Sequence, residues 1–323
     1  MHQSDPATTP VPHVVDSPAA GGGSRPFGVH FRMAGWKALI VIVALPATLL
    51  VTQLGLYLLA GLVESGAPFA PELTPLKLLA ANVSTGLTAL LALALAGWFA
   101  KVPWRIVFSA PRSFDRRRLV TYFLGSLTIV GLVMGAVGLT ASEQVGWTGL
   151  SVTGTTAGLL IVMLLSTPMQ TVGEEIMFRG VLLPAAGSWF RSAKPAFLTG
   201  LILSSAMFAL LHGSSDPLLF AYYLFFSVCT AVMGLLTRGL EAAIAFHTAN
   251  NLLTTTLNAV LSGGGAVAVE RSEGSTGGLA LLLPAAGSVA VLVTVAVRER
   301  ARRHAALHLS QRVPGRSGAE RAE

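Results

Sequence analysis

Residues 153–183 read TGTTAGLLIVMLLSTPMQTVGEEIMFRGVLL. The stretch up to Gly173 contains no charged side chain, and it reaches the roughly 20 residues that a helix needs to cross the hydrocarbon core of a bilayer. Glu174, Glu175 and Arg179 then follow within an otherwise apolar run. The stretch therefore predicts a transmembrane helix that carries ionisable groups into the membrane.

Further apolar blocks of similar length lie on both sides of this one. Of the 323 residues, 53% are hydrophobic and 11% are charged, whereas a soluble domain has about 25% charged residues. We therefore expect an all-α, polytopic integral membrane protein with about eight transmembrane helices. The blocks cover residues 38–62, 76–99, 119–140, 153–173, 196–212, 217–237, 242–261 and 279–297.

The charged residues between the blocks sort by alternate loops. Residues 100–118 hold six basic side chains and one acid, and residues 298–323 hold seven arginines and three glutamates. The opposite loops, with two basic and six acidic residues in total, are 63–77, 141–152, 213–216 and 262–278. Because cytoplasmic loops accumulate Lys and Arg, we expect a multi-pass cell-membrane protein with both termini in the cytoplasm. The basic segments could also contact anionic membrane lipid, although a role as topology signals alone is the simpler interpretation.

The net charge of +7 does not indicate a nucleic-acid partner. The basic residues form short runs between apolar blocks, without the basic face or interleaved aromatic residues that binding to a nucleic-acid backbone requires. The single cysteine, Cys229, excludes an intrachain disulfide framework.

A small set of ionisable residues interrupts the apolar blocks. A charge at the centre of a transmembrane helix costs at least about 2.5–3.5 kcal/mol, so such residues mark functional sites. The set, with two adjacent amides, comprises Glu174, Glu175, Arg179, His212, His247, Asn250 and Asn251.

Helical spacing separates these residues into roles. Glu175 and Arg179 are four residues apart and can form an ion pair on one helix face, whereas Glu174 points about 100° away and has no local partner. Glu174 is therefore the better general base. Phe208 and His212 share a face, as do His247 and Asn251. The alternative for Glu175 and Arg179 is a purely structural pair, and Phe208 then only packs against His212.

The depth of these residues in the membrane is less consistent. Glu174 and His212 lie 18 and 20 residues from Ser192, so an antiparallel helix pair would bring them level. His247 lies only nine residues beyond Arg238, about 13 Å of helix. A simple span therefore places His247 shallower than Glu174.

Three motifs occur in order on separate apolar blocks: Glu174-Glu175-x-x-x-Arg179, Phe208-x-x-x-His212 and His247-x-x-x-Asn251. This order resembles the CPBP family of intramembrane proteases, which includes CAAX prenyl endopeptidases and bacteriocin-processing or self-immunity proteins. The resemblance covers about residues 155–262. It implies an intramembrane catalytic cavity that opens toward the cytoplasm, and an endopeptidase whose peptide or protein substrate arrives from that side.

The resemblance also implies roles for individual residues. Glu174 and His212 would activate a water molecule, His247 and Asn251 would hold the oxyanion or the substrate, and Glu175, Arg179 and Phe208 would support them. Amide hydrolysis needs a nucleophilic water, a base and donors for the oxyanion, and these residue types supply all three. A zinc ion held by Glu174, His212 and His247 is an equal alternative to a metal-free mechanism.

The composition, the apolar blocks and the resemblance together predict a division of the chain into five parts. They are a disordered cytoplasmic tail (1–33), N-terminal transmembrane helices (34–150), a protease core (151–262), a loop with the last transmembrane helix (263–297) and a basic cytoplasmic tail (298–323). Two other functions fit the same residues. One is a non-catalytic immunity or scaffold protein of the same fold, and the other is a proton-coupled transporter, since Glu and His chains also mark proton paths.

Overall fold

The computed structural model describes residues 25–64, 66–268, 271–272 and 278–312. The described residues are overwhelmingly helical, and the predicted all-α membrane fold is confirmed. One short antiparallel pair joins β1 (Glu72–Leu73) to β2 (Val267–Ala268). The α-helices are α1 Gly35–Glu64, α2 Pro75–Leu95, α3 Trp104–Phe108, α4 Arg116–Thr140, α5 Gly154–Glu174, α6 Leu183–Gly187, α7 Ala193–Leu211, α8 Pro217–Thr237, α9 Glu241–Leu261 and α10 Leu282–Arg312.

Within these described ranges, seven helical runs are long and apolar enough to cross a membrane. Seven of the eight predicted blocks correspond to them. The run that begins with α5 continues without a break to Gly187, well past the predicted end at Gly173. The eighth block forms α9, which is helical as expected but is not among the seven. The chain is therefore a multi-pass membrane protein.

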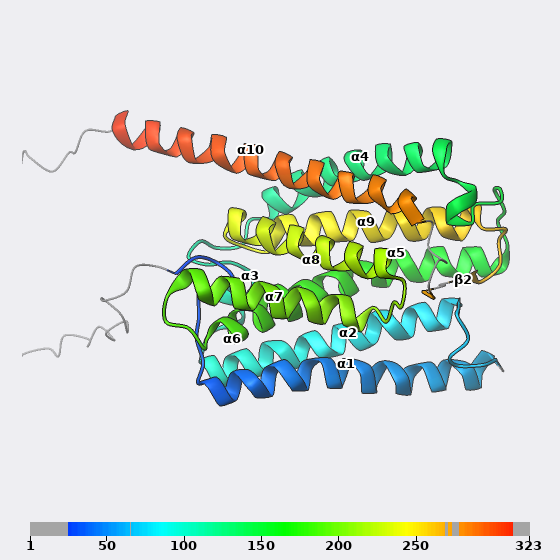
Figure 1. Ribbon diagram of the computed structural model, residues 1–323, viewed down its shortest axis with the longest axis horizontal. Coiled ribbons are helices and arrows are strands. Elements are labelled where there is room, and N and C mark those ends of the chain that lie inside the picture. The colour runs from blue at the N-terminus through cyan, green and yellow to red at the C-terminus, as the bar shows by residue number, and fades with distance from the viewer. Residues whose placement is uncertain (1–24, 65, 269–270, 273–277, 313–323) are drawn as a thin grey trace, which may run out of the picture.

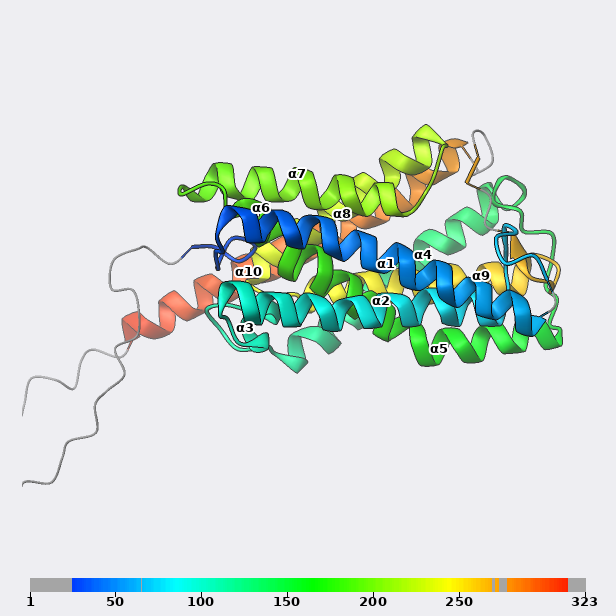
Figure 2. The ribbon, with the colours of Figure 1, turned by 90° about the horizontal axis from the view of Figure 1, so that it is seen from below.

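The long helices lie side by side as a bundle (Figure 1). Helix α9 packs against α4, α5 and α8, and therefore occupies the interior of the bundle. Helix α10 covers α8 and α4, while α1 and α2 lie on the opposite side, with α2 against α5 (Figures 1 and 2). The start of α1 and the end of α10 lie at the same end of the bundle (Figure 1), which matches the eight helical blocks expected from the sequence when α9 is counted with the seven.

Residues 25–33 pack onto the bundle, in contrast to the disordered tail expected for 1–33. Phe27, Val29, Phe31 and Met33 are buried at alternate positions, a pattern that the surrounding Pro, Gly and Ser residues obscure in the sequence. The backbone N–H of Met33 donates to Ser188 Oγ at 3.1 Å. Residues 25–33, which we call the N-terminal strap, thereby pack against the turn between α6 and α7. The rest of the expected tail, residues 1–24, lies outside the described residues.

His30 of the strap provides a test of its packing. Its Nε2–H donates to the carbonyl of Ile106 at 2.9 Å, its Nδ1 accepts from the N–H of Gly28 at 3.1 Å, and its ring stacks on Phe27. Burial lowers the pKa of His30 to about 4, although the bond to the Ile106 carbonyl opposes this shift. As the pH falls, His30 is therefore protonated near pH 6.5 in the unfolded chain but only near pH 4 in the folded chain.

We expect the protein to lose up to about 3 kcal/mol of stability from this group as the pH falls from 7 to 4. The His30→Phe variant should lose less over the same range, because it has nothing to protonate there. Thermal unfolding of the purified protein across this pH range measures the difference. Identical pH dependence in the wild type and the variant would show that His30 is not buried as a neutral ring.

The basic loop 100–118 is fastened to α9 by a buried carboxylate. Glu241, which is fully buried at the start of α9, accepts two hydrogen bonds from the Arg112 guanidinium at 2.5 and 2.6 Å and one from the N–H of Asp115 at 2.8 Å. In the same way, Glu299 of α10 accepts from Arg118 at 3.1 Å and from Tyr122 at 2.6 Å. Glu299 lies in the part of α10 that continues to Arg312, into the segment expected to be a basic tail.

Replacing Glu241 with Ala should destabilise the protein by about 1.5–3 kcal/mol, the usual effect of removing a charged hydrogen-bond partner. The loss leaves the Arg112 guanidinium and the Asp115 N–H without their acceptor. Thermal unfolding in detergent measures the effect, and Glu143→Ala, at an exposed glutamate, is the matched control. Equal melting temperatures for the two variants would contradict a structural role for Glu241.

Candidate active site

The first motif lies where the α-helical geometry changes. Helix α5 ends at Glu174, and the chain continues as a π-helix, η3 (Glu175–Leu182), before α6 begins. All eight residues of η3 are buried. Short π-helical segments inside α-helices occur frequently at functional sites, and this one places Glu174 and Glu175 at the junction of the two geometries.

His247 of α9 lies between the two glutamates. Its Nδ1 is 2.8 Å from Glu175 Oε1, and its Nε2 is 3.4 Å from Glu174 Oε2. The two ring nitrogens point in different directions, so one imidazole reaches two carboxylates that are separated around their helix. The sequence left a tension between the depths of His247 and Glu174, and the structure nevertheless brings the two side chains into contact.

The i,i+4 ion pair expected from the sequence is present. Arg179 Nη1 lies 3.2 Å from Glu175 Oε1, and the two side chains are only 1% and 0% exposed. The guanidinium also donates to the carbonyl of Ser227 at 3.4 Å. Glu175 therefore contacts both Arg179 and His247, whereas Glu174 contacts His247 and is the more exposed carboxylate at 8%.

The cluster has one more acid than permanent base. Two carboxylates and one guanidinium leave one negative charge in excess, and a buried excess charge is costly. Among the described residues, Glu174 Oε2, Glu175 Oε2 and Arg179 Nε have no hydrogen-bond partner. Buried polar atoms of this kind call for water or a ligand, so the cluster is chemically incomplete on its own.

His212 lies at the end of α7 and is held from two sides. Its Nδ1–H donates to the carbonyl of Phe208 at 2.7 Å, so the neutral ring keeps its lone pair on Nε2. The ring of Tyr223 packs on it at a centroid distance of 4.0 Å. Within the described part of the chain, no hydrogen bond or ion pair joins His212 to Glu174 or His247. The sequence did not indicate Tyr223, because it lies in an ordinary apolar block.

Phe208 does more than pack against His212. Its ring centroid lies 4.4 Å from that of His212 and 6.0 Å from that of His247. The Arg179 guanidinium lies over the same ring at 4.6 Å, within the range of a cation–π interaction. Phe208 thus links the first motif to both histidines.

Asn251 lies one turn along α9 from His247 but faces a different partner. Its Nδ2 donates to Gln170 Oε1 at 3.3 Å, and its Oδ1 accepts from Asn250 at 3.2 Å. Gln170 was not among the expected residues. Its position four residues before Glu174 is the sequence signal that could have identified it, because the two side chains share a helix face.

The described geometry accords with one comparison to known proteins. Residues 155–253 match the family model of Rce1-like type II CAAX prenyl endopeptidases. This region is of the CPBP type. No match was found among curated proteins, and none among solved structures. The CPBP match contains all three motifs, and it supports a peptidase of the intramembrane CAAX type in general.

The CPBP core does not assemble a metal site from the expected ligands. Among the residues that the structure describes, no group of three or more His, Cys, Asp and Glu side chains is arranged to hold a metal ion. The expected zinc ligands Glu174, His212 and His247 are therefore not grouped as a metal site in the described residues.

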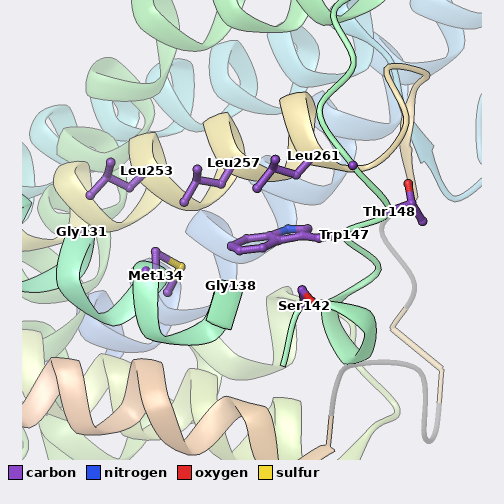
Figure 3. Close-up of a pocket in the computed structure, with 11 residues that line it drawn as sticks. Gly131, Met134, Gly138, Ser142, Trp147, Thr148, Leu253, Leu257 and Leu261 are labelled. Atoms are coloured by element: carbon purple, nitrogen blue, oxygen red, sulfur yellow. The ribbon is translucent and has the colours of Figure 1, made fainter. Parts of the chain in front are cut away.

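A separate apolar groove of about 580 Å³ lies between α4 and α9 (Figure 3). Leu253, Leu257 and Leu261 form its α9 wall, and Trp147, which donates to Asn258 at 2.8 Å, closes it on the other side. None of the candidate catalytic residues of the CPBP core lines this groove. The groove is therefore distinct from the cluster around His247.

Proposed function

We propose that the chain is an intramembrane endopeptidase that hydrolyses a peptide bond with a water molecule activated by Glu174 and His212. The observation that carries the proposal is the imidazole of His247 held between two carboxylates, one of which is neutralised by Arg179. A purely structural pair would not need the second carboxylate or the second imidazole.

In this mechanism, Glu174 takes a proton from water because its Oε2 has no hydrogen-bond partner among the described residues. The neutral His212 orients the same water through its Nε2 lone pair. The water oxygen bonds to the carbonyl carbon, the carbon–nitrogen bond breaks, and the departing amine receives the proton that Glu174 accepted. Water and one amide thus become a carboxylic acid and an amine, with no further reactant.

His247 and Asn251 hold the oxygen of the substrate carbonyl. Glu175 orients the ring of His247 through its contact with Nδ1, and a hydrogen-bond donor from this ring can stabilise the developing oxyanion. Asn251 has an amide that can turn from Gln170 toward the substrate. Glu175 and Arg179 are positioning residues in this scheme, and Phe208 supports both histidines.

The test compares membrane peptides between cells that carry the wild-type protein and cells that carry Glu174→Gln. Mass spectrometry should find one or more peptides whose cleaved form is absent from the variant and present with the control Glu143→Gln. Unchanged peptides together with an intact cellular role in the variant would favour the non-catalytic alternative. Proteoliposome ion flux that is lost in the variant would favour a transporter.

A further inference from the structure

A second pocket, of about 380 Å³, lies between the end of α8 and the C-terminal half of α10. Leu236 and Ala296 supply apolar lining, while Arg300, Arg303 and His304 supply basic lining. The pocket shares no residue with the cluster around His247. A pocket with one apolar side and one cationic side suits a ligand that has both an apolar part and an anionic group.

The single acid in the pocket wall is already neutralised. Glu299 accepts from Arg118 at 3.1 Å, from Tyr122 at 2.6 Å and from Arg302 at 2.9 Å, and none of these three partners lines the pocket. The charge that the pocket presents is therefore that of Arg300 and Arg303.

One of these two arginines is held in place. Arg303 donates from Nη2 to the carbonyl of Leu236 at 2.8 Å, which fixes its guanidinium against the end of α8. This bond uses one of the five N–H donors of the guanidinium. Arg300 lies three residues earlier, on the same face of α10. Two guanidinium groups on one face can bind a phosphate with several charge-assisted hydrogen bonds.

The position of the pocket identifies the source of the phosphate. The apolar run Leu282–His308 includes the α10 lining of the pocket, and Leu236 lies at the end of the apolar run Pro217–Thr237. Ala296 lies one turn closer to the membrane interior than Arg300. Helix α10 extends beyond the other helices at this end of the bundle (Figure 1), and Arg300, Arg303 and His304 are exposed. We propose that the pocket binds the headgroup phosphate of an anionic phospholipid, with the first part of an acyl chain against Leu236 and Ala296.

A lipid bound here joins α8 to α10, so it stabilises the folded protein by mass action. Phosphatidylglycerol added to the full-length protein in detergent should raise the melting temperature, and phosphatidylcholine should not. In the double variant Arg300→Gln/Arg303→Gln, the lipid concentration for half of the maximal shift should rise about 25-fold, because each arginine near the surface contributes a factor of about five.

The matched control is Arg116→Gln/Arg298→Gln, which removes the same charge from two exposed arginines outside the pocket. It should keep the lipid concentration of the wild type. Because Arg303 also holds Leu236, the single variant Arg300→Gln tests the site without that bond being lost, and it should shift the lipid concentration about fivefold.

Three results would overturn the proposal. Equal losses in the pocket and control variants would mean that general surface charge attracts the lipid. An equal shift with phosphatidylcholine would remove the need for an anionic headgroup. A shift of the same size with inorganic phosphate alone would identify a site for free phosphate.

Discussion

Glu174→Gln should leave the protein folded and inserted but lower its turnover about 10²–10⁴-fold, the usual loss when a positioned general base is removed. The substitution keeps the size of the side chain and its position next to His247, while the amide cannot take a proton from water. Glu174 also lies outside the Arg179 ion pair, so its loss strands no cation. The measurement is the rate of cleavage per folded molecule, with a peptide identified in the cellular comparison as substrate.

The control for this measurement is Glu143→Gln, the same chemical change at an exposed glutamate of the 3-10 turn η2 (Glu143–Val145). Its turnover should match that of the wild type. Wild-type turnover in Glu174→Gln would exclude Glu174 as the base. If Glu175→Gln were then well folded and inactive, the roles of the two glutamates would be reversed.

Glu175→Gln should instead destabilise the protein by about 3–5 kcal/mol, because it leaves the buried Arg179 without its counter-ion. A loss of this size is a large part of the 5–15 kcal/mol that stabilises a typical protein. The neutral side chain also makes a weaker hydrogen bond with His247 Nδ1, so turnover per folded molecule should fall as well. Thermal unfolding and the folded fraction after purification measure the first effect.

The double variant Glu175→Gln/Arg179→Met separates the two contributions of Glu175. It removes the cation together with its partner, so it should be more stable than Glu175→Gln alone. Its turnover should stay low, because His247 still lacks a carboxylate at Nδ1. A double variant that is less stable than either single variant would show that the ion pair is not the reason for the loss.

The membrane fold was predictable from the sequence because it depends on composition and length. Each block of about 20 apolar residues must become a helix, since no water is present in the bilayer core to satisfy its backbone. The ends of the helices were less predictable. The helices continue through residues 174–187 and 298–312, where Glu175 and Glu299 have partners on other turns and other helices, which local composition does not reveal.

In the candidate site, contacts within one helix were predictable from the sequence, and contacts between helices were not. The Glu175–Arg179 pair follows from spacing within one helix, and it was predicted. The contact of His247 with both glutamates depends on how α9 lies against α5 and η3, and periodicity within a single helix contains no information about that arrangement. The contact of Tyr223 with His212 depends in the same way on the packing of α8 against α7.

The arrangement of the buried charges also has a consequence for biosynthesis. Glu175 and Arg179 are made together and neutralise each other as soon as their helix forms, so the ribosome delivers to the translocon a segment with a single uncompensated acid, Glu174. His247, whose ring completes the cluster, follows 72 residues after Glu175. The earlier helices are therefore synthesised before their last polar partner exists, and the cluster is complete only after α9 has been made.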